Sequence, residues 1–261
     1  MFDEIVILMK KYTGAELLGH ILERIRAVKA SGDTESAQEG CMAGMTICMK
    51  QVSRSEDDLY YNAFFDFYHE YIGAIDSENM SEDIIIFTIS AAGQLDRLAA
   101  SAPGNAYLNA MTMDLFEKGA AYGMNNNMPE VAMELYERQR DKLIGYSGSF
   151  DVSSRIARVD ANLIMPYVLC REPESAKIVG AEAYDIMCEL YEENPKKYAS
   201  DLFDICSNLG GVYMDANELD EARKVFTQAL EIWNDLPESE KAKNLVQKFA
   251  LDSNMEKLEN K

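Results

Sequence analysis

Two arginines and an asparagine in the middle of the chain have the spacing of a single helix face. Arg155 and Arg158 precede Asn162 by seven and four residues, and residues at such intervals lie on the same side of a helix. A pair of guanidinium groups can bind a carboxylate, and an amide can both donate and accept hydrogen bonds. The three residues therefore predict a site for an acidic or C-terminal peptide. The alternative is that the arginines pair with the abundant acids of the chain itself.

Signatures of catalysis are missing from the sequence. It contains no Gly-rich phosphate loop, no G-x-S-x-G elbow and no H-E-x-x-H motif. The five cysteines form no C-x-x-C pair, and the two histidines, His20 and His69, have no recognisable ligand spacing around them. A carboxylate metal site across two helices stays open, without a Glu-x-x-His motif to support it. We predict that the protein is not an enzyme and that it has neither a metal site nor a cofactor.

The chain is strongly acidic. Its 45 acidic and 25 basic residues give a formal net charge of −20, and such a surface repels phosphate. We therefore expect neither nucleic acid nor an anionic membrane as a direct partner. Between Arg54 and Arg97 there are ten acids and no lysine or arginine. This segment is either a solvated face that keeps the protein soluble or a docking surface for a basic partner.

The sequence also lacks the signals of membrane insertion and secretion. No apolar run approaches the roughly 18 residues that a membrane-spanning helix needs, and Asp3 and Glu4 stand where a signal peptide requires positive charge. The odd number of scattered cysteines is typical of small buried hydrophobic residues in a reducing compartment. We expect a cytoplasmic protein.

Helical signals run along the entire chain. There are only six prolines, and apolar residues recur at helical spacing, for example at Leu202, Ile205 and Leu209. Pro129 and Pro173 occupy positions where a helix places its first residue. The connections are short, so neighbouring helices must be antiparallel. The pattern predicts a helical turn near 2–12 and helices over 14–31, 34–53, 56–77, 81–101, 105–125, 129–146, 151–170, 173–193, 197–216, 218–235 and 239–260.

One stretch of the chain has a recognisable repeat pattern. Asn208–Leu230 carries Leu209-Gly210, Tyr213, Ala222, Phe226 and Ala229. In a helix pair of this kind, small residues let the two helices approach and large residues fill the space between them. These residues and their spacing resemble the tetratricopeptide repeat (TPR), with a clear match over about residues 185–236 and a degenerate one elsewhere. Fainter copies recur every 44 to 48 residues, at positions near 37, 84, 132, 176 and 222.

The resemblance implies an all-α fold of the α-solenoid type. Antiparallel helix hairpins would stack into a right-handed superhelix with an extended concave face, lined mainly by the first helix of each hairpin. We expect about five hairpins and a C-terminal capping helix in a single TPR-like domain over residues 1–261. Within it, 1–147 would form degenerate hairpins, 148–236 the clearer repeats and 237–261 the capping helix.

The resemblance also implies a function. In many TPR proteins an asparagine one residue before the repeat's leucine holds a peptide backbone, and Asn162 and Asn208 occupy this position here. Arg155, Arg158 and Lys118 would extend the same stripe. The protein is thus expected to be a scaffold or adaptor that binds a protein or peptide in its concave groove. The alternative is an acidic inhibitor or mimic that docks on a basic, nucleic-acid-handling protein. Self-association into a homo-oligomer is a further option, because end repeats expose apolar edges.

Overall fold

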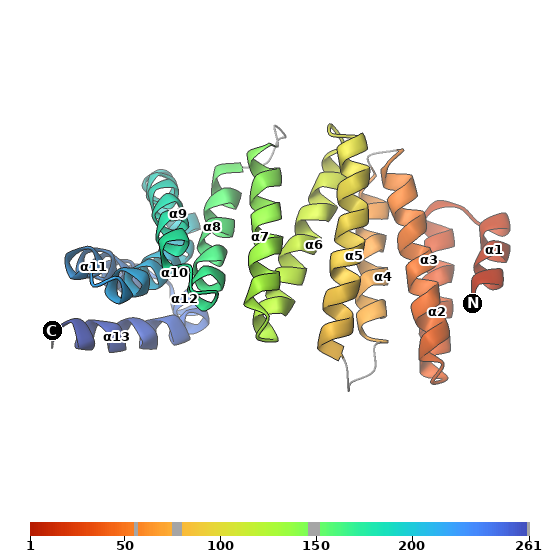
Figure 1. The fold of residues 1–261 in the computed structure, drawn as a ribbon. Helices are drawn as coiled ribbons and strands as arrows, with labels where there is room; N and C mark the ends of the chain where they lie inside the picture. The colour runs from red at the N-terminus through yellow and green to blue at the C-terminus, as the bar shows by residue number, and fades with distance from the viewer. Residues whose placement is uncertain (55–56, 75–79, 146–151, 260–261) are drawn as a thin grey trace. The chain divides into compact units, whose positions relative to one another are not determined.

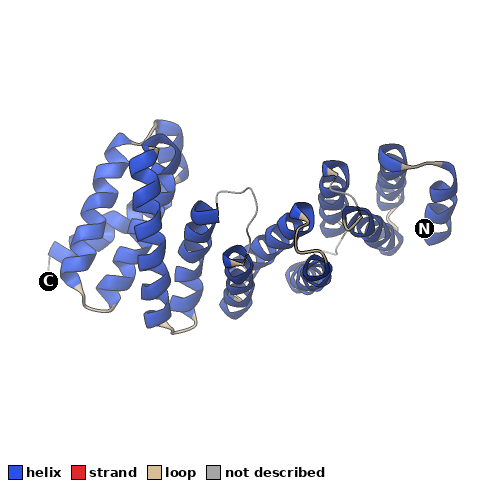
Figure 2. Ribbon diagram, turned by 90° about the horizontal axis from the view of Figure 1, so that it is seen from above, coloured by secondary structure: helices blue, strands red, loops and turns tan. Residues whose placement is uncertain are grey.

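The structure is a computed structural model that describes residues 1–54, 57–74, 80–145 and 152–259, without the side chains of Phe2 and residues 80–83 (Figure 1). Within these ranges the only regular secondary structure is helix, which confirms the predicted all-α fold (Figure 2). Backbone packing divides the chain into two compact units, Met1–Tyr122 and Gly123–Lys261.

In unit 1, α1 packs against α2 and α3, and from α2 onward the helices alternate as first and second members of hairpins. α2 and α3 form one hairpin, and α3 packs against both α2 and α4. α4 and α5 are joined by a buried hydrogen bond between the hydroxyls of Tyr68 and Thr88, 2.7 Å apart. The helices are α1 Phe2–Lys11, α2 Gly14–Ala30, α3 Thr34–Val52, α4 Asp58–Ile72, α5 Met80–Ser101 and α6 Ala106–Asn125, whose last turn belongs to unit 2.

Unit 2 continues the same alternation. α8 and α9 pack as one hairpin and α10 and α11 as the next, with α9 also against α10. Phe203 and Phe226 are fully buried at the centre of the core that α10 and α11 share. The helices are α7 Pro129–Ile144, α8 Val152–Leu169, α9 Pro173–Glu193, α10 Pro195–Asp215, α11 Leu219–Asp235, α12 Glu238–Lys243 and α13 Leu245–Glu259.

Most helix bounds lie close to those predicted from the sequence. Pro129 and Pro173 are indeed the first residues of their helices, and α9 has the predicted bounds. The single C-terminal helix predicted over 239–260 is wrong, because the chain forms α12 and α13 on either side of Asn244. The Asn244 side chain is buried, and its amide donates a hydrogen bond of 2.7 Å to Ser200 Oγ on α10. A helix that continued through Asn244 would have to give up this tertiary contact or shift against α10.

The repeat pattern appears in the structure as small buried residues at one position of the second helices. Ala132, Ala176 and Ala222 are each the fourth residue of their helix, and none is exposed to solvent. In the last hairpin Gly210 faces the ring of Phe226, and a Cβ atom at Gly210 would lie 2.2 Å from Phe226 Cε1. The two helices can therefore approach only because Gly210 has no side chain, and the Phe226 ring fills the space that remains.

The turns that precede α7, α9 and α11 have the same backbone geometry. Asn127, Arg171 and Asn217 have positive φ angles of 57°, 64° and 60°. The N–H of the next residue donates to the carbonyl five residues back, with an N···O distance of 2.8 Å in all three turns. A first helix that ends in this way needs one left-handed residue. Asparagine adopts that conformation more readily than arginine does, so Arg171 is the least favourable of the three.

Replacing Arg171 with asparagine should therefore stabilise the protein by about 0.5–1 kcal/mol. The melting temperature, followed by circular dichroism, should rise by about 1–3 °C. Arg171→Ala is the matched control, because it removes the same exposed charge but keeps a residue that disfavours positive φ. If the asparagine variant is no more stable than the alanine variant, the backbone at position 171 is not a source of strain.

Candidate functional site

The predicted binding residues of unit 2 lie on two neighbouring first helices. α8 and α10 pack directly against each other. Residues 46 positions apart occupy equivalent places on the two helices. The face on α8 carries Arg155, Arg158 and Asn162, and the face on α10 carries Asp201, Asp204 and Asn208. We call these six residues the α8–α10 face. It combines both predicted asparagines with two aspartates that were not predicted.

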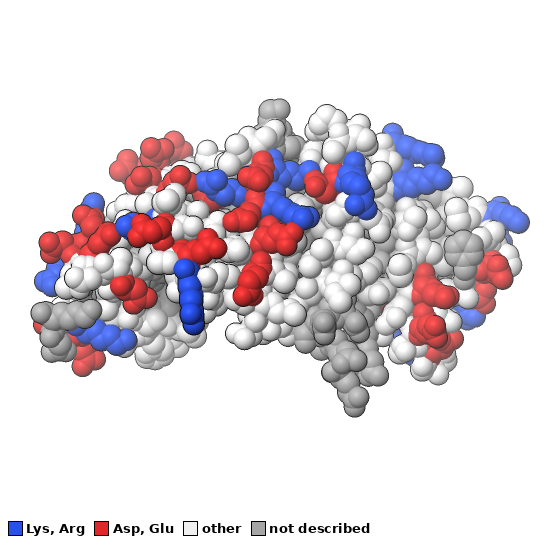
Figure 3. Space-filling view, in the orientation of Figure 1, with Lys and Arg blue, Asp and Glu red and all other residues white. Residues whose placement is uncertain are grey.

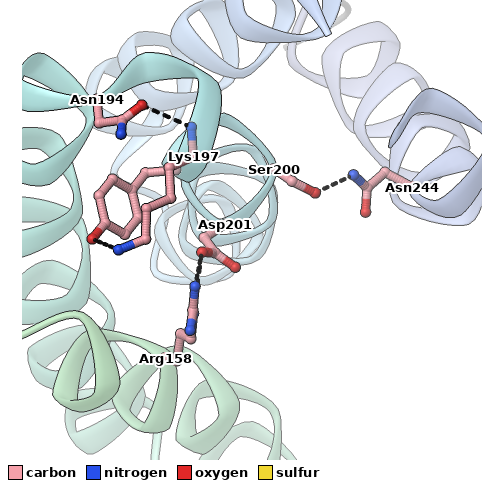
Figure 4. A network of polar contacts seen from close by, with 7 residues as sticks. Arg158, Asn194, Lys197, Ser200, Asp201 and Asn244 are labelled. Atoms are coloured by element: carbon pink, nitrogen blue, oxygen red, sulfur yellow. Dashed lines mark hydrogen bonds and ion pairs between the residues drawn. The ribbon is translucent and has the colours of Figure 1, made fainter. Parts of the chain in front are cut away.

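An ion pair joins the two helices across this face (Figure 4). Arg158 Nη2 lies 2.8 Å and Arg158 Nε 3.1 Å from Asp201 Oδ2. Both side chains are partly exposed, and pairs of this kind contribute about 0–1 kcal/mol to stability. This is the pairing with the chain's own acids that the sequence left open. Because Asp201 occupies the guanidinium group, a ligand carboxylate would have to compete for Arg158.

Asp204 follows Asp201 by one helical turn and is partly buried. Burial, and to a smaller extent the negative charge of Asp201, raise the pKa of Asp204 from 3.8 to about 6. Within the described residues Asp204 Oδ1 has no hydrogen-bond partner. Leaving a buried carboxylate oxygen without a donor costs free energy. That oxygen is itself buried, so a ligand N–H group could reach it only if the Asp204 side chain turned outward.

The two asparagines lie one turn further along the same faces. Asn162 is exposed and Asn208 partly exposed, so a ligand can reach both amides. Gly211 follows Asn208 by one turn inside α10, and a Cβ atom there would meet nothing within 4 Å. A glycine inside a helix costs about 1 kcal/mol relative to alanine, and packing among the described residues gives no reason for it. What the glycine does provide is space for a ligand backbone to approach α10.

Arg155 and Lys118 complete the predicted set. Arg155 is partly exposed and precedes Arg158 by one turn on α8. Lys118 lies on α6 in unit 1, with its Nζ 5.7 Å from the centre of the Phe65 ring, a cation–π arrangement. The structure thus places Lys118 beside Phe65 of α4. Its membership of the same stripe as Asn162 stays a prediction.

Unit 1 contains a groove that the sequence analysis missed. It lies between the first helices α2 and α4 and has a volume of about 180 Å³. It is lined by Ala15, Leu18, Gly19 and Leu22 of α2 and by Leu59, Asn62, Ala63, Asp66 and Phe67 of α4. The four α2 residues and the first four α4 residues follow the same i, i+3, i+4, i+7 pattern, 44 residues apart. This offset matches the repeat period, so the groove is formed by equivalent faces of two successive first helices.

The two buried cysteines of α3 do not carry reactive thiols. Burial raises the pKa of both Cys41 and Cys48 to about 12, so these thiols are protonated at neutral pH. No three His, Cys, Asp or Glu side chains in the described ranges are arranged to hold a metal ion. None of the helices described here is both long and apolar enough to cross a membrane.

Comparison with solved structures shows where this fold has been seen before. The chain is similar to BtubC (BKLC) from P. vanneervenii, with a TM-score of 0.58 and 18% sequence identity over 84% of each chain. The nearly identical TPR-like repeats of a candidate kinesin light chain from Podosopora anserina give a TM-score of 0.47 and 17% identity, over 82% of this chain and 94% of that chain. No family model matches the sequence, and no curated protein does. At such identities the similarity concerns the fold alone. The hairpin packing and the likeness to BtubC together support the helical-repeat fold that the sequence predicted.

Proposed function

We propose that the protein is a non-catalytic, cytoplasmic scaffold that binds an extended segment of a partner protein on the α8–α10 face. The observation that carries the proposal is the pair of equivalent amides, Asn162 and Asn208, on adjacent first helices, with the open Gly211 beside the second. Two such amides can bind the N–H and C=O groups of one extended backbone, whatever its side chains. The free cysteines fit a reducing compartment such as the cytoplasm.

The charges of the face determine which ligands suit it. Arg158 and Asp201 neutralise each other, and Asp204, partly buried one turn from Asp201, adds a second carboxylate to the face. The face therefore favours a ligand that donates hydrogen bonds over one that brings a carboxylate. This changes the expectation from the sequence alone, in which the two arginines were the attraction for an acidic peptide.

The surface of α7 weighs against mimicry of a nucleic acid. In Figure 3 acidic and basic side chains are interleaved over this helix on the face in view. On α7, Arg138 pairs with Glu134, and Arg140 pairs with Asp160 on α8 and Glu182 on α9. A mimic that docks on a basic partner needs an extended field of one sign, and interleaved pairs reduce such a field.

A pull-down from the native host lysate, at low salt and near 0.5 M salt, tests the proposal. We expect wild type to retain a partner at high salt, where charges are screened beyond about 4–5 Å, and Asn162→Ala/Asn208→Ala to lose it. Asn234→Ala is the matched control, since it removes an exposed amide from the second helix α11. A partner that the double variant retains but that salt releases would refute binding through the amides and support the acidic-surface alternative.

A further inference from the structure

The groove between α2 and α4 has the features of a pocket for one large side chain. Its walls are mainly apolar, and its volume is about 180 Å³. Gly19 lies in the middle of α2, and a Cβ atom at this position would meet nothing within 4 Å. Alanine there would be more favourable for the helix by about 0.5–1 kcal/mol. Neither packing nor a positive φ angle explains the glycine, so the groove is held open at a cost to helix stability.

The polar residues of the groove determine whether a basic or an acidic ligand side chain fits beside them. Asn62 and Asp66 are its polar lining residues, both are exposed, and no lysine or arginine lines the groove. The bases of α2 are already engaged: Arg24 binds Glu4, while Arg26 and Lys29 both bind Glu70. Arg26 lies close enough to attract Asp66, but its guanidinium group is held by Glu70, so a ligand carboxylate would lie against Asp66 without a free guanidinium or ammonium group beside it. A ligand lysine or arginine would find a carboxylate and an amide oxygen within the same groove.

The groove runs along both helices, so it can contact more than one residue of a ligand. Its residues run along two helical turns of both α2 and α4, from Ala15 to Leu22 and from Leu59 to Asp66. The apolar residues Leu22, Leu59 and Phe67 can surround one aliphatic or aromatic side chain. Asp66 lies one turn beyond Asn62 on the same helix, so a neighbouring ligand residue can reach it.

We propose that this groove binds a peptide segment of a partner protein in which a large apolar residue stands next to a lysine or arginine. The apolar side chain occupies the space left open at Gly19, and the base pairs with Asp66. This site is in unit 1, has a ligand chemistry different from that of the α8–α10 face, and does not require that face to bind anything. It also assigns a use to Gly19, whose lack of a side chain neither packing nor a positive φ angle explains.

Panning of a phage-displayed random 12-residue peptide library on the full chain tests this assignment. The bound phages are divided by counter-selection on Gly19→Trp, whose side chain fills the groove. We expect the clones that Gly19→Trp fails to bind to share an apolar residue adjacent to lysine or arginine, with at least a tenfold loss of affinity for the variant. Gly93→Trp is the matched control, because Gly93 is also a helical glycine with open space around it but lies on the second helix α5.

Two further variants separate the parts of the proposal. Asp66→Asn leaves the shape of the groove unchanged and should weaken the basic clones about tenfold, the effect expected for one charge-assisted hydrogen bond. Asn162→Ala/Asn208→Ala should bind these clones as wild type does, whether or not the proposed function is correct. The assignment is overturned if no clones are enriched, if Gly19→Trp binds them as well as wild type, or if Asp66→Asn does. Melting temperatures of the variants equal to that of wild type exclude misfolding as the cause of a loss.

Discussion

Gly210→Ala is expected to lower the free energy of unfolding by about 2–3 kcal/mol, in spite of the better helix propensity of alanine. The new Cβ atom would lie 2.2, 2.5 and 2.8 Å from three carbons of the Phe226 ring, all inside van der Waals contact. Phe226 is fully buried in the core of α10 and α11, so the ring cannot rotate outward. Either the two helices must separate or the ring must leave its rotamer, and both options lose packing. Urea unfolding followed by circular dichroism measures the loss.

The neighbouring glycine supplies the control for this experiment. Gly211→Ala adds the same methyl group one residue later in the same helix, where nothing lies within 4 Å. It should stabilise the protein by up to about 1 kcal/mol, which is the helix propensity difference alone. Phe226→Leu combined with Gly210→Ala should cost less than the sum of the two single changes, since the smaller side chain leaves room for the methyl group. Equal effects of the two alanine variants would contradict the close approach of α10 and α11.

These two glycines show how far the sequence could predict the fold. The repeat pattern assigned Gly210 to the helix interface because its spacing to Phe226 is fixed by the geometry of one hairpin. Helix starts at Pro129 and Pro173 were predictable for a similar reason, as they follow from local backbone chemistry. The end of a helix at Asn244 was not, because it depends on a hydrogen bond to Ser200, 44 residues away in the chain.

For the candidate sites, too, the sequence predicted relations within one helix but not contacts between helices. Spacing along one helix put Arg155, Arg158 and Asn162 on a common face, since that relation is internal to the helix. The partner of Arg158 is Asp201 on another helix, and its identity depends on how α8 and α10 are rotated against each other. The α2–α4 groove was missed for this reason too. The 44-residue offset between Gly19 and Ala63 was visible in the sequence, but the gap between their helices is a result of packing.

Replacement of Arg140 by methionine is expected to destabilise the protein by about 3–5 kcal/mol at pH 8, the cost of leaving a buried charge without its partner. Arg140 on α7 binds Asp160 on α8 and Glu182 on α9. The Asp160 side chain is fully buried, and within the described residues its Oδ2 has no hydrogen-bond partner. Methionine keeps much of the volume of the arginine side chain and removes only the charge and the donors. Urea unfolding at pH 8 gives the size of the loss.

The dependence on pH distinguishes an uncompensated Asp160 charge from a simple loss of packing. Burial already raises the pKa of Asp160 from 3.8 to about 6, and Arg140 opposes the rise. Without Arg140 the pKa in the folded protein must rise further. For an acid whose pKa is raised by folding, the stability contribution is fully present below the unfolded value and is lost as the pH rises through the folded value. The loss of unfolding free energy caused by Arg140→Met should therefore be smaller at pH 5.5, one unit above the sequence pI of 4.5, than at pH 8.

The double variant Arg140→Met/Asp160→Asn has no charge to bury at position 160. It should recover stability at pH 8, and its loss of unfolding free energy should change little between the two pH values. A deficit of equal size at both pH values in the single variant would mean that Arg140 acts through packing and that the Asp160 charge does not need it.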